Sequence, residues 1–133
     1  MTDDKQRQNR RLAERKEAAF SLYYTIEFPF DLRIKLGVPG EVGGLMRDLS
    51  ELGTAIVTKY DIPTGTKLLI MFNLLNSHLS GENRLRHLRL RAEVTSNLFS
   101  GAGGYRLGLR FDKVSNEDKN AIREYIKSKG GNF

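Results

Sequence analysis

Short runs of strand-forming residues alternate with turns that contain glycine or proline along most of the chain. Aromatic and β-branched residues favour strands, and regularly spaced turn residues between such runs are typical of all-β folds. Closing the sheet into a barrel removes exposed strand edges. The expected strands span residues 20–28, 32–36, 54–60, 67–75, 86–99 and 105–114.

Alternation within these runs gives a strand one apolar and one polar face. Leu88 and Leu90 alternate with Arg89 and Arg91, which predicts a strand with its leucines directed inward. The segment 32–36 has the same alternation, and we expect it to be a strand as well.

One helix is expected after the last strand, over about residues 115–128. Ser115 is a suitable N-cap, and Glu117 and Asp118 occupy the first turn, where the helix dipole favours anions. An apolar stripe follows, which predicts that the helix packs against the barrel. We therefore expect a small antiparallel β-barrel with a C-terminal helix.

Residues 1–17 are almost entirely polar and lack an apolar stripe that would hold a helix on a core. This segment is expected to be a flexible basic arm that is ordered by what it binds. The barrel and its helix are expected over residues 18–128, followed by a tail at 129–133.

Composition narrows the function classes. The 133 residues suit one domain, and the absence of cysteine excludes disulfides and thiolate chemistry. We expect the charged, polar N-terminal segment not to be a secretory signal, and the longest apolar run, 68–72, is too short to span a membrane. We expect a cytoplasmic protein. Its net charge of +6 favours an anionic partner, although the same charge also keeps a small domain soluble.

Catalytic chemistry is not indicated. His78 and His87, the only histidines, do not have a metal-ligand spacing, and no pair of carboxylates is set for acid–base work. The glycine-rich stretch at 100–104 joins two strands and opens no helix, which excludes the phosphate-binding glycine motifs. A binding protein without a metal is expected.

Two short motifs carry binding chemistry. The first, RRLAER, places Arg11 and Arg15 four positions apart, directly after Arg10. A guanidinium group can fork onto a phosphate, stack on a purine and donate to guanine O6 and N7. The alternative interpretation is a solvated basic tail. Arg7 and Arg11 have the same spacing, but the second pair lies closer to the first strand.

The second motif is DLSELG, residues 48–53, just before an apolar strand. The carboxylate of Asp48 can accept the N1 and N2 donors of guanine, and the Ser50 hydroxyl can donate or accept. Gly53 would let a ligand approach the backbone. The alternative is a structural turn in which Gly53 supplies a positive φ.

In combination, these motifs resemble the PilZ family of cyclic di-GMP receptors. That family's pattern is Arg-x-x-x-Arg, then Asp/Asn-x-Ser-x-x-Gly, then a late strand with Gly-x-x-Phe before a C-terminal helix. The third part matches YRLGLRF at 105–111. The resemblance implies a six-stranded barrel and a non-enzymatic receptor whose arginine arm closes over cyclic di-GMP and signals to an effector protein.

The resemblance also implies residue roles. Arg11 and Arg15 would hold phosphate and guanine, while Asp48 and Ser50 would take a guanine edge, with Gly53 leaving room. Arg10 falls where some family members carry an extra arginine associated with a stacked pair of ligand molecules. Effectors in bacterial motility, adhesion or polysaccharide machinery are expected by the same likeness.

Two other functions stay open. A degenerate domain of this fold would bind only another protein. A basic barrel would bind single-stranded nucleic acid through a stripe of arginines on the outward face of a strand. That stripe would consist of Arg84, Arg86, Arg89 and Arg91.

Overall fold

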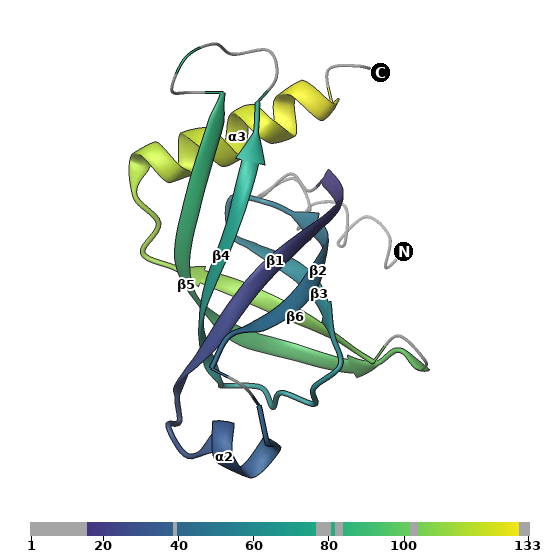
Figure 1. Cartoon of the computed structure of the whole chain (residues 1–133). Helices are drawn as coiled ribbons and strands as arrows, with labels where there is room; N and C mark the ends of the chain where they lie inside the picture. The colour runs from purple at the N-terminus through teal and green to yellow at the C-terminus, as the bar shows by residue number, and fades with distance from the viewer. Residues whose placement is uncertain (1–15, 39, 77–80, 82–83, 102–103, 131–133) are drawn as a thin grey trace, which may run out of the picture.

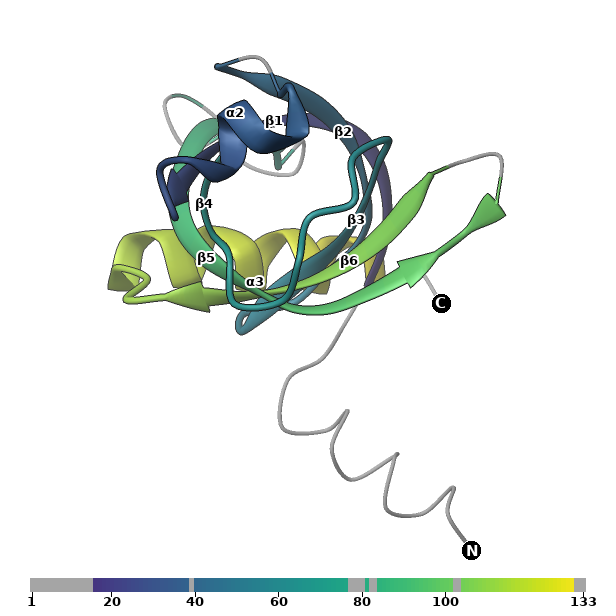
Figure 2. The ribbon, with the colours of Figure 1, turned by 90° about the horizontal axis from the view of Figure 1, so that it is seen from below.

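The computed structural model is a closed barrel of six antiparallel strands, with two helices among the residues that the structure describes (Figures 1 and 2). Its strands are β1 (Lys16–Phe28), β2 (Val42–Leu49), β3 (Gly53–Thr58), β4 (Lys67–Leu75), β5 (Leu85–Phe99) and β6 (Tyr105–Asp112). They follow one another around the barrel in the order β1-β2-β3-β6-β5-β4, and β4 pairs with β1 to close it. The structure describes residues 16–38, 40–76, 81, 84–101 and 104–130.

Alternating side chains of β4, β5 and β6 point into the barrel and fill much of it. On β5, Leu88 and Leu90 are buried, whereas Arg89 and Arg91 are exposed, as their alternation predicts. Leu107 and Leu109 on β6 are buried in the same core. The expected fold class, an all-β barrel with a C-terminal helix, is confirmed.

The C-terminal helix α3 spans Asn116–Gly130 and lies across one end of the barrel, over β4 and β5 (Figure 1). Ser115 is its N-cap, because the Ser115 hydroxyl accepts the backbone N–H of Asp118 at 3.1 Å. The ring of Tyr125 meets that of Phe20 edge-on, with centroids 6.0 Å apart. No helix in the described part of the chain is long and apolar enough to cross a bilayer.

The prediction of a strand at 32–36 is wrong. Those residues form a short helix, α2 (Leu32–Leu36), at the end of the barrel opposite α3 (Figure 1). Asp31 and Lys35 form an ion pair of 3.0 Å with the i,i+4 spacing of a helical turn. Gly37 ends the helix in the left-handed conformation, and its N–H bonds to the carbonyl groups of the last turn. A five-residue alternation is too short to exclude one helical turn.

Strand β2 is the one that the sequence pattern missed. Its buried residues do not alternate, because the pairing register shifts along the strand. Its second and third residues are also consecutive glycines, Gly43 and Gly44, which are poor strand formers. The count of six strands agrees with the expectation, but one of them lies ten residues further along the chain.

A tyrosine hydroxyl inside the barrel predicts alkaline sensitivity. Tyr24 is fully buried and shares a hydrogen bond of 2.8 Å with the hydroxyl of Thr58. Burial raises the pKa of Tyr24 from 10.0 to about 12. The unfolded chain therefore ionises first. The stability that comes from this difference is complete below pH 10 and is lost as the pH rises towards 12.

We expect the free energy of unfolding to fall by about 1.4 kcal/mol from this group alone between pH 9 and pH 11. Urea titrations at both pH values measure it. Tyr24→Phe is the reference, since it removes the ionising hydroxyl while retaining the ring. A wild-type protein whose stability changes no more than that of Tyr24→Phe would contradict this expectation.

Candidate functional site

A β-bulge in β2 decides which way Asp48 faces. Met46 pairs with Ile56, whereas Asp48 pairs with Ala55, so one extra residue lies between the two pairs on β2. An unshifted strand would direct Asp48 to the same face as Met46, which is fully buried in the barrel. The bulge instead places Asp48 on the outer face, beside the next strand.

Two strands hold the carboxylate of Asp48. The backbone N–H of Ala55 on β3 donates to its Oδ1 at 3.0 Å, and Nη2 of Arg106 on β6 donates to Oδ2 at 3.4 Å. The hydroxyl of Thr54 donates to the backbone carbonyl of Asp48 at 2.6 Å. The Asp48 side chain is 16% exposed, which leaves a fixed acceptor at the surface of the barrel.

Ser50 uses its hydroxyl to shape the turn between β2 and β3. Its Oγ accepts the backbone N–H groups of Leu52 and Gly53, both at 3.2 Å, and donates to the carbonyl of Gly53 at 3.3 Å. Ser50 itself is fully buried. The Ser50 hydroxyl therefore has the bonds that the structural-turn interpretation requires. It lies below the protein surface, whereas the Asp48 carboxylate reaches that surface.

Gly53 is required by close packing against β6. A Cβ atom added there would overlap the carbonyl oxygen of Leu109 and lie 3.1 Å from its carbonyl carbon. The φ angle of Gly53 is not positive, so the part of the structural-turn alternative in which it supplies a left-handed conformation is wrong. Its role is to let two strands approach at the start of β3.

The same turn is tied to the neighbouring elements. The backbone N–H of Phe111 on β6 donates to the carbonyl of Leu52 at 2.8 Å. Glu51 forms an ion pair of 2.8 Å with Arg123 of α3. The hydrogen bond from Arg123 lowers the pKa of Glu51. The Asp48–Gly53 segment is thus fastened to both β6 and the C-terminal helix.

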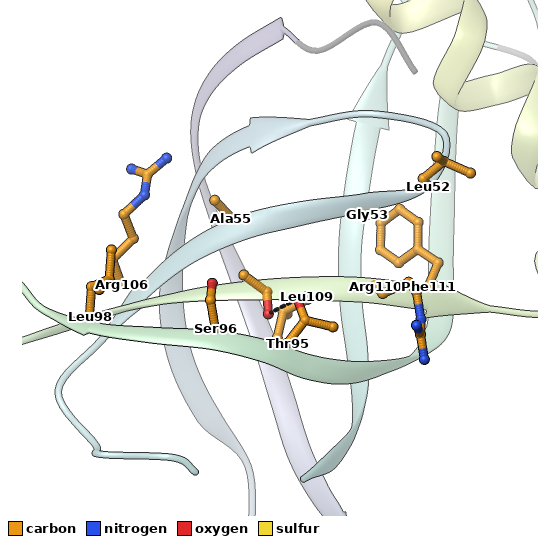
Figure 3. A pocket seen from close by; sticks show the side chains of 11 residues that line it. Leu52, Gly53, Ala55, Thr95, Ser96, Leu98, Arg106, Leu109, Arg110 and Phe111 are labelled. Atoms are coloured by element: carbon orange, nitrogen blue, oxygen red, sulfur yellow. Dashed lines mark hydrogen bonds between the residues drawn. The ribbon is translucent and has the colours of Figure 1, made fainter. Parts of the chain in front are cut away.

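Small residues form the floor of a groove next to Asp48, whose carboxylate contacts the lining residues Ala55 and Arg106. Ala55 pairs with Gly108 of β6, and Gly108 pairs with Ser96 of β5, so these residues continue the row across the sheet. The hollow over them has a volume of about 430 Å³. Figure 3 shows the side chains that line it.

Two arginines flank this floor. Arg106 and Arg110 lie two residues before and two after Gly108, both exposed on β6, and both line the groove (Figure 3). Arg110 also pairs with Glu93 at 3.5 Å. The groove therefore combines two guanidinium groups and a flat floor, with the carboxylate of Asp48 beside it, an arrangement suited to an anionic ligand with a planar base.

Gly108 keeps the floor low. A Cβ atom on this residue would overlap the hydroxyl of Ser96 on β5. Three residues further on, Phe111 is buried against the core. The glycine of the late-strand motif is therefore explained by close packing at the outer surface, and its phenylalanine by burial in the core.

The structure brings together Asp48, Ser50 and Gly53 within one turn, although only the Asp48 side chain faces outward. The predicted arginines Arg10, Arg11 and Arg15 lie outside the described residues. Sequence reasoning missed Arg106 and Arg110. Their alternation with the buried leucines of β6 marks both as outward, but the pairing of β6 with β3 is needed to place them beside Asp48.

The arginine stripe of the nucleic-acid alternative is divided. Its members are Arg84, Arg86, Arg89 and Arg91. Arg86 lies in phase with the buried face of β5 and donates to Asp118 of α3 at 3.0 Å. Arg91 faces the opposite way and donates to Glu27 at 3.0 Å. These arginines do not form one continuous cationic surface, and no group of acids or histidines able to hold a metal ion is found among the residues described.

Comparison with known proteins identifies the fold and the family. The model of the PilZ domain family matches residues 5–128. No curated protein matches the sequence significantly.

Several solved structures share the fold at low sequence identity. The motility inhibitor MotI of Bacillus subtilis superimposes with a TM-score of 0.67 and 17% identity, over 89% of this chain and 50% of MotI. The PilZ domain of YcgR from Escherichia coli, solved with cyclic di-GMP, gives 0.58 and 18% over 92% and 93% of the two chains. The PilZ domain of CeSA from a cellulose-synthesising bacterium gives 0.55 and 15%, over 88% and 98%. The chain spans about half the length of MotI.

Proposed function

The chain belongs to the PilZ domain family, and from this premise we propose that it is a non-enzymatic receptor for cyclic di-GMP in the bacterial cytoplasm. The observation that carries the proposal is the outward carboxylate of Asp48, which contacts Ala55 and Arg106, two residues that line a neighbouring groove. The structure of the YcgR PilZ domain with cyclic di-GMP supports the choice of ligand.

The groove suits a guanine base next to Asp48. The carboxylate accepts the N1–H and N2–H donors of the base, and the small residues Ala55 and Gly108 leave space for its flat face. Ser50 acts beneath this surface, where it fixes the turn that carries Asp48, whereas Gly53 lines the groove. Ser50 therefore has a positioning role in this proposal, in place of direct contact with the base.

The arm completes the site. Arg11 and Arg15 close over the bound dinucleotide and hold its phosphates and a base face from the side opposite Asp48. Arg10 provides a third guanidinium group for a second, stacked ligand molecule. The ordered arm then forms part of a surface that an effector protein recognises.

The class of effector follows from the relatives. MotI is described as an inhibitor of motility, and CeSA comes from a cellulose-synthesising bacterium. Motility, adhesion or polysaccharide machinery is therefore the proposed target of the signal. Pull-down with and without cyclic di-GMP tests this step separately from ligand binding.

Isothermal titration with cyclic di-GMP tests the receptor function. We expect the wild-type protein to bind and Asp48→Ala to bind at least about tenfold more weakly, because a charge-assisted pair of hydrogen bonds is lost. Glu51→Ala is the matched control: it removes an acid from the same turn, but one that faces Arg123. It should bind as the wild type does.

Failure of the folded wild-type protein to bind would reject the receptor function in favour of a degenerate, protein-binding domain. Equal losses in Asp48→Ala and Glu51→Ala would show that the turn matters only as a whole. Thermal melting of each variant confirms that it is folded.

A further inference from the structure

Arg106 lies where it can share a ligand with Asp48. It is on β6, opposite Val57 of β3 and Leu98 of β5, and it points outward along the edge of the groove (Figure 3). Its Nη2 is 3.4 Å from Oδ2 of Asp48, and its side chain is 44% exposed. A basic group and an acidic group from two different strands therefore lie side by side at the groove's edge.

The contact between them is long and open to solvent. Ion pairs of this kind stabilise folded proteins little. Arg106 has further donor N–H groups in the same plane, since a guanidinium group carries five. The contact between Arg106 and Asp48 can therefore open for a ligand at little cost in stability.

Guanine matches this order of groups. Along its Watson–Crick edge, the O6 acceptor is adjacent to the N1–H donor, which is followed by the N2 amino donor. A carboxylate complements the two donors, and a guanidinium group beside it complements O6. Adenine presents an amino donor in place of O6 and an acceptor at N1. Its donor would therefore face the guanidinium donors, and its acceptor would face the carboxylate, which is also an acceptor.

We propose that Arg106 and Asp48 together read the Watson–Crick edge of one guanine, with Arg106 donating to O6, and that this pair gives preference for cyclic di-GMP over cyclic di-AMP. The inference rests on the proposed function and adds to it a residue outside the arm and outside the Asp48–Gly53 turn.

Arg110 offers a matched control. It is on the same strand and the same face, lines the same groove and carries the same charge. Both arginines lie one outward position from Gly108, but Arg110 lies opposite Gly53 and forms its ion pair with Glu93, whereas Arg106 forms its ion pair with Asp48. Loss of Arg110 therefore weakens the general attraction for a dianion without removing the group beside Asp48.

Isothermal titration of the full chain with cyclic di-GMP, and competition by cyclic di-AMP, separates the two effects. We expect Arg106→Ala to lose at least about tenfold in cyclic di-GMP affinity, from one charge-assisted hydrogen bond, and Arg110→Ala to lose less than about threefold. Arg106→Lys keeps the charge but not the planar fork, so it should fall between them. Cyclic di-AMP should compete with cyclic di-GMP at least as well in Arg106→Ala as in the wild-type protein.

A loss in Arg106→Ala no larger than in Arg110→Ala would overturn the inference. Tighter binding in Arg106→Ala would also overturn it, because Arg106 would then only block Asp48. These outcomes differ from failure of the wild-type chain to bind cyclic di-GMP, which rejects the receptor function itself. Thermal melting identifies any variant that does not fold, and Arg106→Lys then supplies the comparison.

Discussion

Replacing Gly53 with alanine is expected to destabilise the barrel by roughly 3 kcal/mol, at the upper end of what overpacking costs. The added Cβ would overlap the carbonyl oxygen of Leu109, and the atoms it meets are all backbone of β6. No side chain can rotate away, so either the strands separate or the turn shifts. The melting temperature should fall by about 10 °C or more.

Two other glycines calibrate this effect. A Cβ on Gly43 of β2 would lie 3.8 Å from the ring of Tyr23, an ordinary contact, so Gly43→Ala should change stability by less than about 0.5 kcal/mol. Gly108→Ala should be intermediate, because it meets the hydroxyl of Ser96, and Ser96→Ala should relieve it. If Gly53→Ala has the same melting temperature as Gly43→Ala, the close-packing role of Gly53 is contradicted.

Loss of the arm's arginines should abolish most ligand affinity without affecting the fold. Each of Arg11→Ala and Arg15→Ala is expected to weaken cyclic di-GMP binding at least about tenfold, and the double variant about a hundredfold, since charge-assisted hydrogen bonds contribute about 1.5–3 kcal/mol each. These bonds must offset an ordering cost of about 1–2 kcal/mol for each arm residue that becomes fixed. Melting of the ligand-free variants should match that of the wild type.

Arg7 provides the control for register, because Arg7 and Arg11 have the same spacing as Arg11 and Arg15. Arg7→Ala should bind nearly as well as the wild type. If Arg7→Ala loses as much affinity as Arg11→Ala while Arg15→Ala does not, the arginine motif lies four residues earlier in the sequence, at Arg7 and Arg11. Unaltered affinity in both Arg11→Ala and Arg15→Ala would remove the arm from the site.

Local pattern was sufficient for most of the barrel. Strands β4, β5 and β6 alternate cleanly or are long apolar runs, and α3 has both a cap and a stripe, so each could be predicted from its own residues. Alternation of apolar and polar residues gave a wrong prediction for two segments, β2 and α2. The bulge in β2 breaks the alternation, and the isolated turn of α2 imitates it.

The site was predictable only in part, because strand pairing decides which of its residues face outward and lie together. Asp48 was recognised by its motif, but its outward direction depends on the bulge, which only strand pairing reveals. Ser50 was expected to face a ligand and is instead enclosed in its turn. Arg106 comes from a strand that is distant in sequence, and only the β3–β6 pairing brings it beside Asp48.

The pairing of β1 with β4 has a consequence for how an effector can be recruited. In the described part of the chain, the first half of β1 pairs with β2 and the second half, from Tyr23, pairs with β4, so the backbone of the wall is covered where these pairings run. Over that paired part a partner cannot join by β-augmentation, the route by which many signalling domains capture extended peptides. Recognition there has to be made by side chains on a convex surface, which makes it sensitive to point substitutions.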